Sequence, residues 1–233
     1  MLIYVCFSQP EEWESAIAGW THIALRLEEA SGGRWCLTVP FYRLSVDFVR
    51  QVQPEAIILS GFGRSFQDFE VRDFYPVADV VETFEDIPIL AFCGGHQLLG
   101  FLFNGTLRTA ERLYDEPMRL RRPGEPIINP DYHPEYFMEN GFYELTLHEP
   151  DPLFEGCGDP PIVREAHYCE IKKLPPGFKL LASTPECRIQ AMRHLQRPIV
   201  SVQFHPELYT ERFPDGKRIL ENFFREMLTA RSA

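Results

Sequence analysis

The stretch PILAFCGGHQLLGFLFNG, residues 88–105, joins two apolar runs through the triplet Cys93, Gly94 and Gly95. The first run has the length and composition of a buried strand, and the second has the length of a short helix. A buried strand that turns at once into a helix is the building unit of α/β proteins with a parallel sheet. The stretch therefore predicts the fold class and places Cys93 at the carboxyl end of a strand.

Strand-like and helix-like runs alternate on the N-terminal side of this stretch as well. Each apolar run of strand length is followed by a segment that carries apolar residues at helical spacing. This alternation predicts an α/β fold with a doubly wound, mostly parallel central sheet and helices on both faces. We expect strands at residues 2–7, 34–41, 55–61 and 87–93, and helices at residues 13–30, 45–52, 74–85 and 96–103.

The C-terminal half of the chain has a different sequence pattern. Prolines at short intervals interrupt every helical pattern between residues 115 and 140, which predicts a Pro-rich surface insertion. The sequence shows no linker, so we expect one domain over residues 1–233. Beyond the insertion we expect strands at residues 141–147, 161–171, 178–184, 189–194 and 198–204, and a last helix at residues 215–228.

Composition argues against several classes of function. Lys and Arg number 23 against 34 Asp and Glu, a formal net charge of −11, so the chain lacks the basic surface of a nucleic-acid-binding protein. We interpret its one basic segment, with Arg119, Arg121 and Arg122, as a solvated loop in preference to a site for an acidic partner. The sequence has neither an export signal nor an apolar run of membrane-spanning length. Six cysteines without a CxxC spacing predict free thiols in a cytoplasmic protein.

The cysteine at the corner has two interpretations. Reactive groups of open α/β sheets gather at the carboxyl ends of strands, where the N-terminus of the following helix stabilises a thiolate. There the backbone N–H of Gly94 would face a developing oxyanion. A cysteine in a strand is more often a buried packing residue, however, and a thiol nucleophile needs a base. The choice between the two interpretations depends on residues elsewhere in the chain.

A base and further oxyanion donors follow other predicted strands. His205 stands just past the apolar run PIVSVQF, and Glu207 follows two residues later, where its carboxylate can orient the imidazole. Gly61 and Gly63 follow the run EAIILS and can offer backbone N–H groups, although an ordinary glycine turn has the same appearance. These residues together with Cys93 predict a site of nucleophilic catalysis at one edge of the sheet.

Four segments together resemble the class I, triad-type glutamine amidotransferases: FCGGHQLLG, SVQFHPE, ILSGFGRS and REAHYCEIKKLPPGFKLLAST. The resemblance covers the chain apart from the insertion and implies a flavodoxin-like fold. It implies that Cys93 attacks the side-chain amide of glutamine, that His205 transfers protons and that Glu207 orients His205. Ammonia then leaves, and water cleaves a γ-glutamyl thioester without any metal or cofactor. We assign His96 to packing at the corner. The oxyanion and substrate-binding residues that the resemblance implies are Gly61, Phe62, Gly63, Gly94, Gln97 and His167.

The chain departs from the family pattern at a few positions. Ala91 and Ser201 replace glycines, and both changes are small enough to be tolerated. Gly94 stands where the family usually has a large apolar residue. Phe62 and Arg64 stand at glycine positions of the oxyanion loop, which predicts a reshaped pocket or one that takes a substrate bulkier than free glutamine.

Three functions stay open at this point. The favoured one is release of ammonia for a separate synthetase, because the chain contains no Ser-Gly-Gly-x-Asp-Ser pyrophosphatase loop. The second is hydrolysis of γ-glutamyl peptides or amides without a partner, with Phe62, Arg64 and the insertion shaping a wider pocket. The third is a non-catalytic binding or regulatory role for the same fold, against which the intact set of Cys93, His205 and Glu207 argues.

Overall fold

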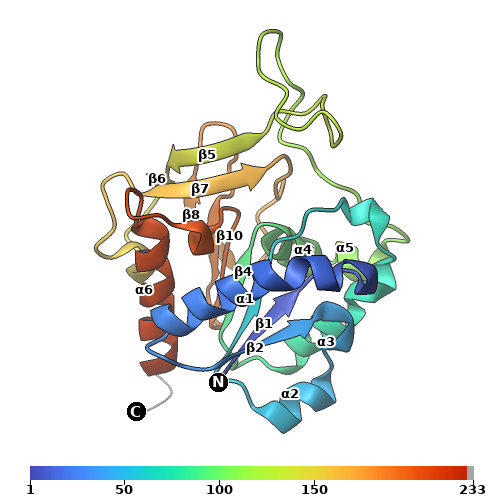
Figure 1. Cartoon of the computed structure of the whole chain (residues 1–233), viewed down its shortest axis with the longest axis vertical. Coiled ribbons are helices and arrows are strands. Elements are labelled where there is room, and N and C mark those ends of the chain that lie inside the picture. The colour runs from blue at the N-terminus through green and yellow to red at the C-terminus, as the bar shows by residue number, and fades with distance from the viewer. Residues whose placement is uncertain (230–233) are drawn as a thin grey trace.

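An eight-stranded sheet runs through the protein, and five neighbouring strands of it are parallel (Figure 1). The computed structural model describes residues 1–229. The parallel strands lie in the order β2 (Cys36–Pro40), β1 (Leu2–Cys6), β3 (Ala56–Leu59), β4 (Ile89–Phe92) and β10 (Ile199–Val202). The sheet continues antiparallel through β9 (Ala191–His194), β8 (Phe178–Ser183) and β6 (Thr146–Leu147). The prediction of a mostly parallel central sheet is confirmed.

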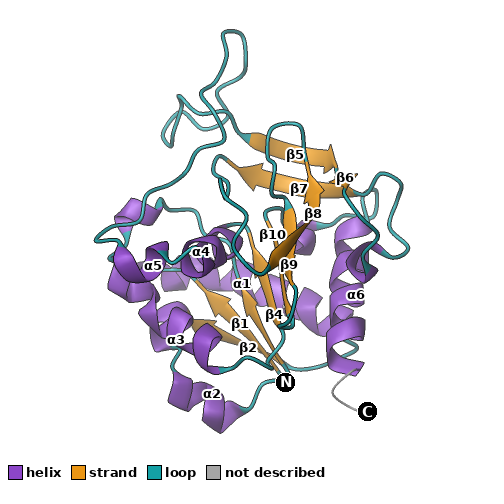
Figure 2. Cartoon of the chain, turned by 180° about the vertical axis from the view of Figure 1, so that it is seen from behind, coloured by secondary structure: helices purple, strands orange, loops and turns teal. Residues whose placement is uncertain are grey.

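Helices cover both faces of the sheet, as predicted. One face carries α2 (Val46–Val52), α3 (Tyr75–Thr83), α4 (Gly94–Phe103) and α5 (Thr106–Thr109), and the other carries α1 (Trp13–Ala30) and α6 (Asp215–Thr229). Helix α1 lies in front of the sheet in Figure 1, whereas α4 and α5 lie in front in Figure 2. Alternation along the strands explains the two layers: in β1, Ile3 and Val5 join one apolar cluster, and Leu2 and Tyr4 join the other.

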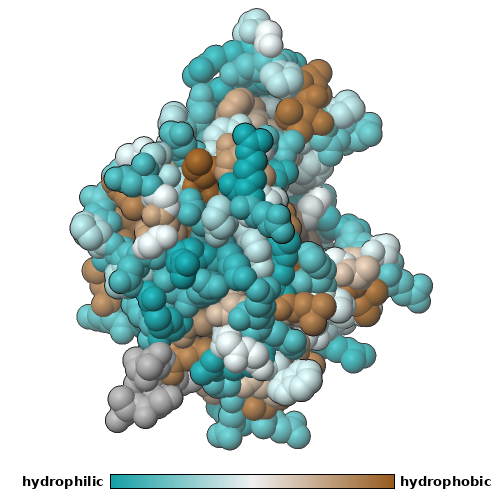
Figure 3. All heavy atoms as spheres, turned by 60° about the vertical axis from the view of Figure 1, so that its left-hand side comes forward, coloured by the Kyte–Doolittle hydropathy of each residue, from teal (hydrophilic) through white to brown (hydrophobic). Residues whose placement is uncertain are grey.

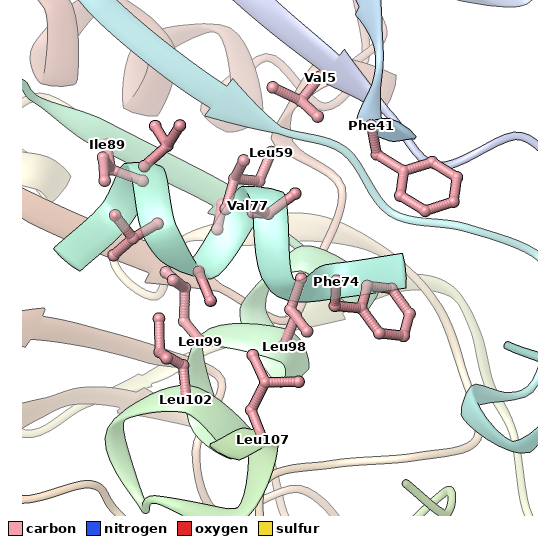
Figure 4. Close-up of a cluster of buried hydrophobic side chains, with 14 of the residues drawn as sticks. Val5, Phe41, Leu59, Phe74, Val77, Ile89, Leu98, Leu99, Leu102 and Leu107 are labelled. Atoms are coloured by element: carbon pink, nitrogen blue, oxygen red, sulfur yellow. The ribbon is translucent and has the colours of Figure 1, made fainter. Parts of the chain in front are cut away.

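The apolar cluster on the α3–α5 side fixes the helix that follows Cys93. Leu98 and Leu99 of α4 pack with Val77 of α3 against the strand residues Leu59 and Ile89 (Figure 4). All of these side chains are nearly or fully buried. Removal of this apolar surface from water therefore holds α4 on the sheet and, with it, the corner at its N-terminus.

A second sheet has only two strands, the antiparallel pair β5 (Glu139–Glu144) and β7 (Ile162–His167). It lies above the carboxyl ends of the parallel strands in Figure 1. The sequence predicted strands in both segments but did not separate them from the main sheet. Within residues 1–229, six 3-10 helices connect the elements: η1 (Pro10–Glu12), η2 (Phe41–Arg43), η3 (Phe66–Asp68), η4 (Val71–Phe74), η5 (Pro152–Phe154) and η6 (Pro206–Leu208).

The Pro-rich insertion forms the projection at the top of Figure 1 and has no helix or named strand between residues 110 and 138. Its description as a surface segment is only partly right, since Met118 and Glu139 are buried. Arg119, predicted to be solvated, is only partly exposed, and its guanidinium pairs with Glu125 and Glu186 at 2.7 Å each. The space-filling view shows scattered apolar residues on a largely hydrophilic face and some of them on this projection (Figure 3).

No helix within residues 1–229 combines the length and the apolar character needed to cross a membrane.

A close backbone contact joins α4 to β3. A Cβ atom added to Gly95 would lie 2.8 Å from the carbonyl oxygens of both Leu59 and Ser60, a distance that real Cβ atoms essentially never show. The Gly95 N–H donates a hydrogen bond to Ser60 O at 3.1 Å. Only glycine therefore permits the helix to start this close to the end of β3.

We predict that Gly95→Ala lowers the free energy of unfolding by about 1–3 kcal/mol, because backbone carbonyls must move to admit the methyl group. Urea denaturation followed by circular dichroism measures the loss. Gly19→Ala in the exposed part of α1 is the matched control, since a Cβ there meets no atom within 4 Å. It is expected to raise stability by up to about 1 kcal/mol. Equal effects of the two substitutions would contradict the contact described.

Candidate active site

Three neighbouring strand ends bring the predicted site residues together. β4 lies between β3 and β10 in the sheet, and all three run parallel. Residues 61–63 follow β3, Cys93 follows β4, and His205 follows β10. The carboxyl ends of parallel strands share one edge of a sheet, so the three segments meet there.

The backbone at Cys93 is strained. Cys93 has φ 44° and ψ −108°, a conformation that residues with a side chain rarely adopt, and it precedes the first residue of α4. Its N–H donates to Val202 O at 2.9 Å, and its carbonyl accepts from Gln97 N–H at 3.0 Å. A conformation of this kind costs about 1–3 kcal/mol and persists because such bonds fix it. Its effect is the sharp strand-to-helix turn that presents a side chain at the sheet edge.

His205 and Glu207 form a hydrogen-bonded pair. His205 Nδ1 lies 2.7 Å from Glu207 Oε1, and the Glu207 side chain is 4% exposed. The backbone of this segment is also held: His205 N–H donates to Arg164 O at 2.8 Å, and the Arg26 guanidinium donates to Glu207 O at 2.5 Å. The pair therefore has a fixed orientation at the end of β10.

Gly61 lies beside both the cysteine and the histidine. A Cβ atom at position 61 would lie 3.0 Å from Cys93 Cβ, 3.7 Å from Cys93 Sγ and 3.1 Å from His205 Cε1. Both side chains are thus close to the same point, which a residue without a side chain leaves open. The fold therefore brings together Cys93 and His205, which are more than a hundred positions apart in the sequence.

The electrostatics of the pair favour an imidazolium beside the thiol. Burial opposes protonation of His205, but the charges of Glu207 and Cys93 and hydrogen bonds with both hold the His205 pKa well above its usual value. A positive imidazole stabilises a neighbouring thiolate. In contrast, burial raises the pKa of each of the other thiols, which are Cys6, Cys36, Cys157, Cys169 and Cys187.

Phe62 and Gly94 are complementary departures from the family pattern. A Cβ atom at Gly94 would lie 2.4 Å from Phe62 Cε1, so the phenyl ring occupies the space that a side chain at position 94 would need. The ring also packs against Phe7, Phe66 and Phe69, with centroids 5.0–5.4 Å away. The large apolar side chain that the family usually has at position 94 is thus replaced here by Phe62 from the loop after β3.

His96 and Gln97 follow the corner and point to different partners. Burial lowers the pKa of His96 to about 3, so its imidazole is neutral. Its Nε2–H donates to Ile189 O at 3.1 Å, and its Nδ1 accepts a hydrogen bond from Ser201 Oγ at 2.8 Å. The family usually has glycine at position 201, which has no hydroxyl. Here the Ser201 hydroxyl provides the hydrogen bond that the buried imidazole of His96 needs. Gln97 Nε2 donates to Cys169 O at 3.0 Å and lies in the wall of the cavity beside Cys93.

His167 belongs to a buried polar cluster that the sequence did not predict. Its Nε2–H donates to Glu139 Oε2 at 3.0 Å, and Glu165 Oε2 lies 3.1 Å from the same nitrogen without receiving a hydrogen bond. Glu139 also accepts from Thr184 Oγ1 at 2.7 Å and from Gln190 Nε2 at 2.8 Å. Both carboxylate oxygens of Glu139 therefore accept hydrogen bonds from other residues of the protein.

Two carboxylates around one imidazole set its charge. Burial opposes protonation of His167, but the adjacent Glu139 and Glu165 outweigh it and raise the His167 pKa to about 10. Burial raises the pKa of Glu165. Ligand atoms of these three residues lie within 4.8 Å of one another, a spacing suited to a metal ion. The hydrogen bonds of Glu139 compete with such a use, and we interpret the cluster as an internal ion network.

A cavity of about 240 Å³ opens beside Cys93. Of the predicted residues, Phe62, Gly63, Gly94, Gln97 and His167 line it with Cys93, whereas Gly61, His205 and Glu207 do not. The sequence indicated, under its second candidate function, that the insertion would shape the pocket, but not which of its residues reach the cavity, because no periodic pattern marks these positions. The insertion residues that line the cavity are Asp115, Asn129, Tyr132 and Met138.

The sequence family described as glutamine amidotransferase class-I matches residues 37–227. The chain therefore belongs to the class-I glutamine amidotransferases. The sequence-based prediction of a glutaminase-type amidotransferase is confirmed at this level.

Two individual proteins are similar to this chain over most of their length. The chain is 32% identical over 179 residues to a subunit of the glutamine-hydrolyzing GMP synthase of Pyrococcus furiosus, covering 76% of this chain and 78% of that protein. It is 32% identical over 185 residues to anthranilate synthase component 2 of Methanothermobacter marburgensis, covering 78% and 79%.

Solved structures share the fold. The crystal structure of a protein assigned as a GMP synthase subunit from Thermoplasma acidophilum superposes with a TM-score of 0.69 at 25% identity, over 100% of this chain and 96% of that one. The glutaminase domain of Trypanosoma brucei CTPS superposes with a TM-score of 0.66 at 15% identity, over 98% and 93% of the two chains. The likeness to both confirms the class-I amidotransferase fold.

The raised pKa of His167 predicts a stability that falls toward alkaline pH. Its contribution is complete below the unfolded-state pKa of about 6.5 and is lost as pH rises to about 10, because the unfolded chain releases the proton first. The slope is at most about 1.4 kcal/mol per pH unit for one proton. We expect urea denaturation at pH 7 and pH 9 to show a larger loss for the wild type than for His167→Gln.

His22→Gln, at an exposed position of α1, is the matched control and should keep the wild-type pH dependence. Identical slopes for wild type and His167→Gln would contradict the charge assigned to the buried cluster.

Proposed function

We propose that Cys93, His205 and Glu207 form a catalytic triad that hydrolyses the side-chain amide of glutamine, and that the ammonia passes to a separate synthetase subunit. The observation that supports the triad is the packing of Gly61 against both Cys93 and His205, with Glu207 Oε1 2.7 Å from the outer imidazole nitrogen. Family membership supplies the substrate class. Six free thiols suit a reducing compartment, and we place the protein in the cytoplasm.

The first half-reaction breaks the amide bond. The Cys93 thiolate attacks the amide carbon, and its Sγ–C bond forms as the carbonyl oxygen becomes an oxyanion. His205, held protonated by Glu207, gives its proton to the amide nitrogen, and the C–N bond breaks with release of ammonia. The product on the enzyme is a γ-glutamyl thioester, and the imidazole is left neutral.

The second half-reaction restores the enzyme. Neutral His205 takes a proton from water, and the oxygen of that water attacks the thioester carbon. The C–S bond then breaks, glutamate leaves, and the thiolate and imidazolium are restored. Glu207 stays ionised throughout and stabilises the positive imidazole.

The oxyanion forms twice and needs donors at the same place. We assign these to the backbone N–H groups of Gly94 and of the loop at Gly61 and Gly63, and one such donor is typically worth about 3 kcal/mol of transition-state stabilisation. Gln97 and His167 are assigned to the wall of the substrate site, since both line the cavity that contains Cys93.

Delivery of ammonia to a partner is supported by the kinds of protein that the chain resembles. The anthranilate synthase component 2 and the GMP synthase subunit are both named as parts of larger synthases, and the chain covers more than three quarters of each. These two names concern different products, so the likeness does not select an acceptor. We therefore propose that a separate synthetase receives the ammonia, and we name no acceptor molecule for it.

The insertion supports one alternative function. Asn129, Tyr132 and Met138 reach the cavity beside Cys93 and, with Phe62 and Arg64, change its shape. A γ-glutamyl peptide or amide hydrolase acting without a partner is therefore the second candidate. Both candidate functions use the same triad. They differ in the leaving group, which is ammonia in the first and the rest of a γ-glutamyl peptide or amide in the second.

We predict that Cys93→Ala lowers the rate of ammonia release from glutamine by about 10³-fold or more, because the nucleophile is lost. Coupled ammonia assays on glutamine and on a panel of γ-glutamyl amides and dipeptides measure the rates. Cys36→Ala in the edge strand β2 is the control and should retain the wild-type rate.

Preference for glutamine, with a rate that rises when a synthetase is added, would support ammonia delivery. Faster turnover of γ-glutamyl dipeptides without any partner would select the hydrolase instead. Full ammonia release by Cys93→Ala would exclude Cys93 as the nucleophile and with it the triad. Absence of turnover by the wild type on every substrate, with and without a synthetase, would leave a non-catalytic role for the fold.

A further inference from the structure

The insertion is fastened to the segment that directly follows the loop with Gly61 and Gly63. Ser65 Oγ lies 3.0 Å from the Tyr132 hydroxyl oxygen and 2.8 Å from His133 Nε2, both of which are hydrogen-bonding distances. Ser65 is 3% exposed, and a single hydroxyl can donate a hydrogen bond to one partner while it accepts one from another. The loop and the insertion, which are far apart in the sequence, are thus joined at a buried point.

Two further hydrogen bonds join the same elements. Phe66 N–H donates to Asp115 Oδ1 at 2.9 Å, and Asp115 N–H donates to Gln67 Oε1 at 3.1 Å. Three consecutive residues, Ser65, Phe66 and Gln67, therefore each have a partner in the insertion. His133 has φ 53°, a left-handed conformation that residues with a side chain rarely adopt and that persists where surrounding contacts fix it. The insertion thus meets the loop with a defined geometry.

The loop has little packing at Gly63 and Arg64. Both residues border two cavities, of about 240 Å³ and about 250 Å³. A Cβ atom at Gly63 would meet no atom of residues 1–229 within 4 Å, and glycine leaves the backbone free to turn. Arg64 pairs with Glu12 at 2.6 Å, but these side chains are 35% and 34% exposed, and ion pairs at such positions hold weakly. Ser65, two residues after Gly63, therefore supplies a buried tether where the loop lacks packing.

We propose that the insertion holds the loop after β3 in place through Ser65, with Tyr132 and His133 as positioning residues for the oxyanion donors of that loop. This inference rests on the proposed function, because it takes the backbone N–H groups at Gly61 and Gly63 as those donors. The oxyanion exists only while the tetrahedral intermediate forms and breaks down, so the position of the donors affects kcat more than KM. The insertion then acts on the rate of the reaction as well as lining the cavity.

The experiment compares two reactions of Cys93 in the variants Ser65→Ala and His133→Asn. Hydrolysis of glutamine passes through an oxyanion, whereas alkylation by iodoacetamide displaces iodide from a saturated carbon and forms none. Both variants are expected to lower kcat for glutamine by about tenfold to a hundredfold with a nearly unchanged KM, and to keep the wild-type alkylation rate of Cys93. Asparagine tolerates the left-handed backbone at position 133, but its shorter side chain loses the hydrogen bond to Ser65.

Ser183→Ala and His148→Asn are the matched controls, because Ser183 Oγ and His148 Nε2 lie 3.0 Å apart in a second serine–histidine pair. Ser183 is in β8, which two strands separate from β4, and both control variants should behave as wild type. The double variant Ser65→Ala/His133→Asn should be no slower than Ser65→Ala alone, because the loss of the hydroxyl already removes the hydrogen bond to His133.

Unchanged kcat in either Ser65→Ala or His133→Asn would overturn the proposal. An alkylation rate that falls together with kcat would also overturn it, since the substitution would then disturb the thiol and not the donors. Hydrogen exchange at the amides of Phe66, Asp68 and Phe69, which donate hydrogen bonds next to the tether, tests the tether without turnover. If the wild type hydrolyses no γ-glutamyl compound, faster exchange at these amides in Ser65→Ala would support the tether while rejecting the proposed function. Unchanged exchange would reject the tether.

Discussion

The close approach of three backbone segments at the carboxyl edge of the sheet is the constraint on which the site depends. Gly95 rests on the carbonyl oxygens at the end of β3, and Gly61 rests on both Cys93 and His205. A Cβ atom at Gly95 would collide with backbone oxygens at 2.8 Å, and one at Gly61 would force its neighbours, at 3.0 and 3.1 Å, to shift by a few tenths of an ångström. The strained backbone of Cys93 persists because hydrogen bonds to Val202 and from Gln97 fix it on both sides. Packing of α4 on the sheet, together with these backbone hydrogen bonds, therefore positions the thiol.

Two departures from the family pattern are paired in space. Phe62, after β3, fills the volume that a side chain at Gly94, after β4, would take. A third departure, Ser201 in β10, supplies a hydroxyl that satisfies the buried imidazole of His96 in α4. These contacts keep the packing density and the hydrogen bonding of the corner. The reshaped loop is compatible with the same close approach of Gly61 to Cys93.

The sequence predicted the parts of the fold that local patterns encode. Alternating apolar runs indicated the parallel strands and both helical layers, and the residues after β3, β4 and β10 were expected at one edge because parallel strands end together. The second sheet was missed because long-range contacts leave no local signal. The sequence indicated that the insertion would shape the pocket, but it did not indicate which insertion residues line the cavity, since proline-rich segments have no periodicity. One signal was available: Glu165 and His167 stand two apart in a strand, so their side chains share a face. Their pairing with Glu139 required the register of β5 on β7.

The central claim is that Cys93 is the nucleophile and that His205 activates it. The most direct measurement uses a glutamine analogue with an electrophilic carbon in place of the amide carbon, followed by peptide mass spectrometry of all six cysteines. We expect covalent labelling of Cys93 alone, slowed by glutamine and strongly reduced in His205→Asn. Labelling of another thiol in preference to Cys93, or labelling of Cys93 that neither glutamine nor the His205 substitution slows, would contradict the central claim.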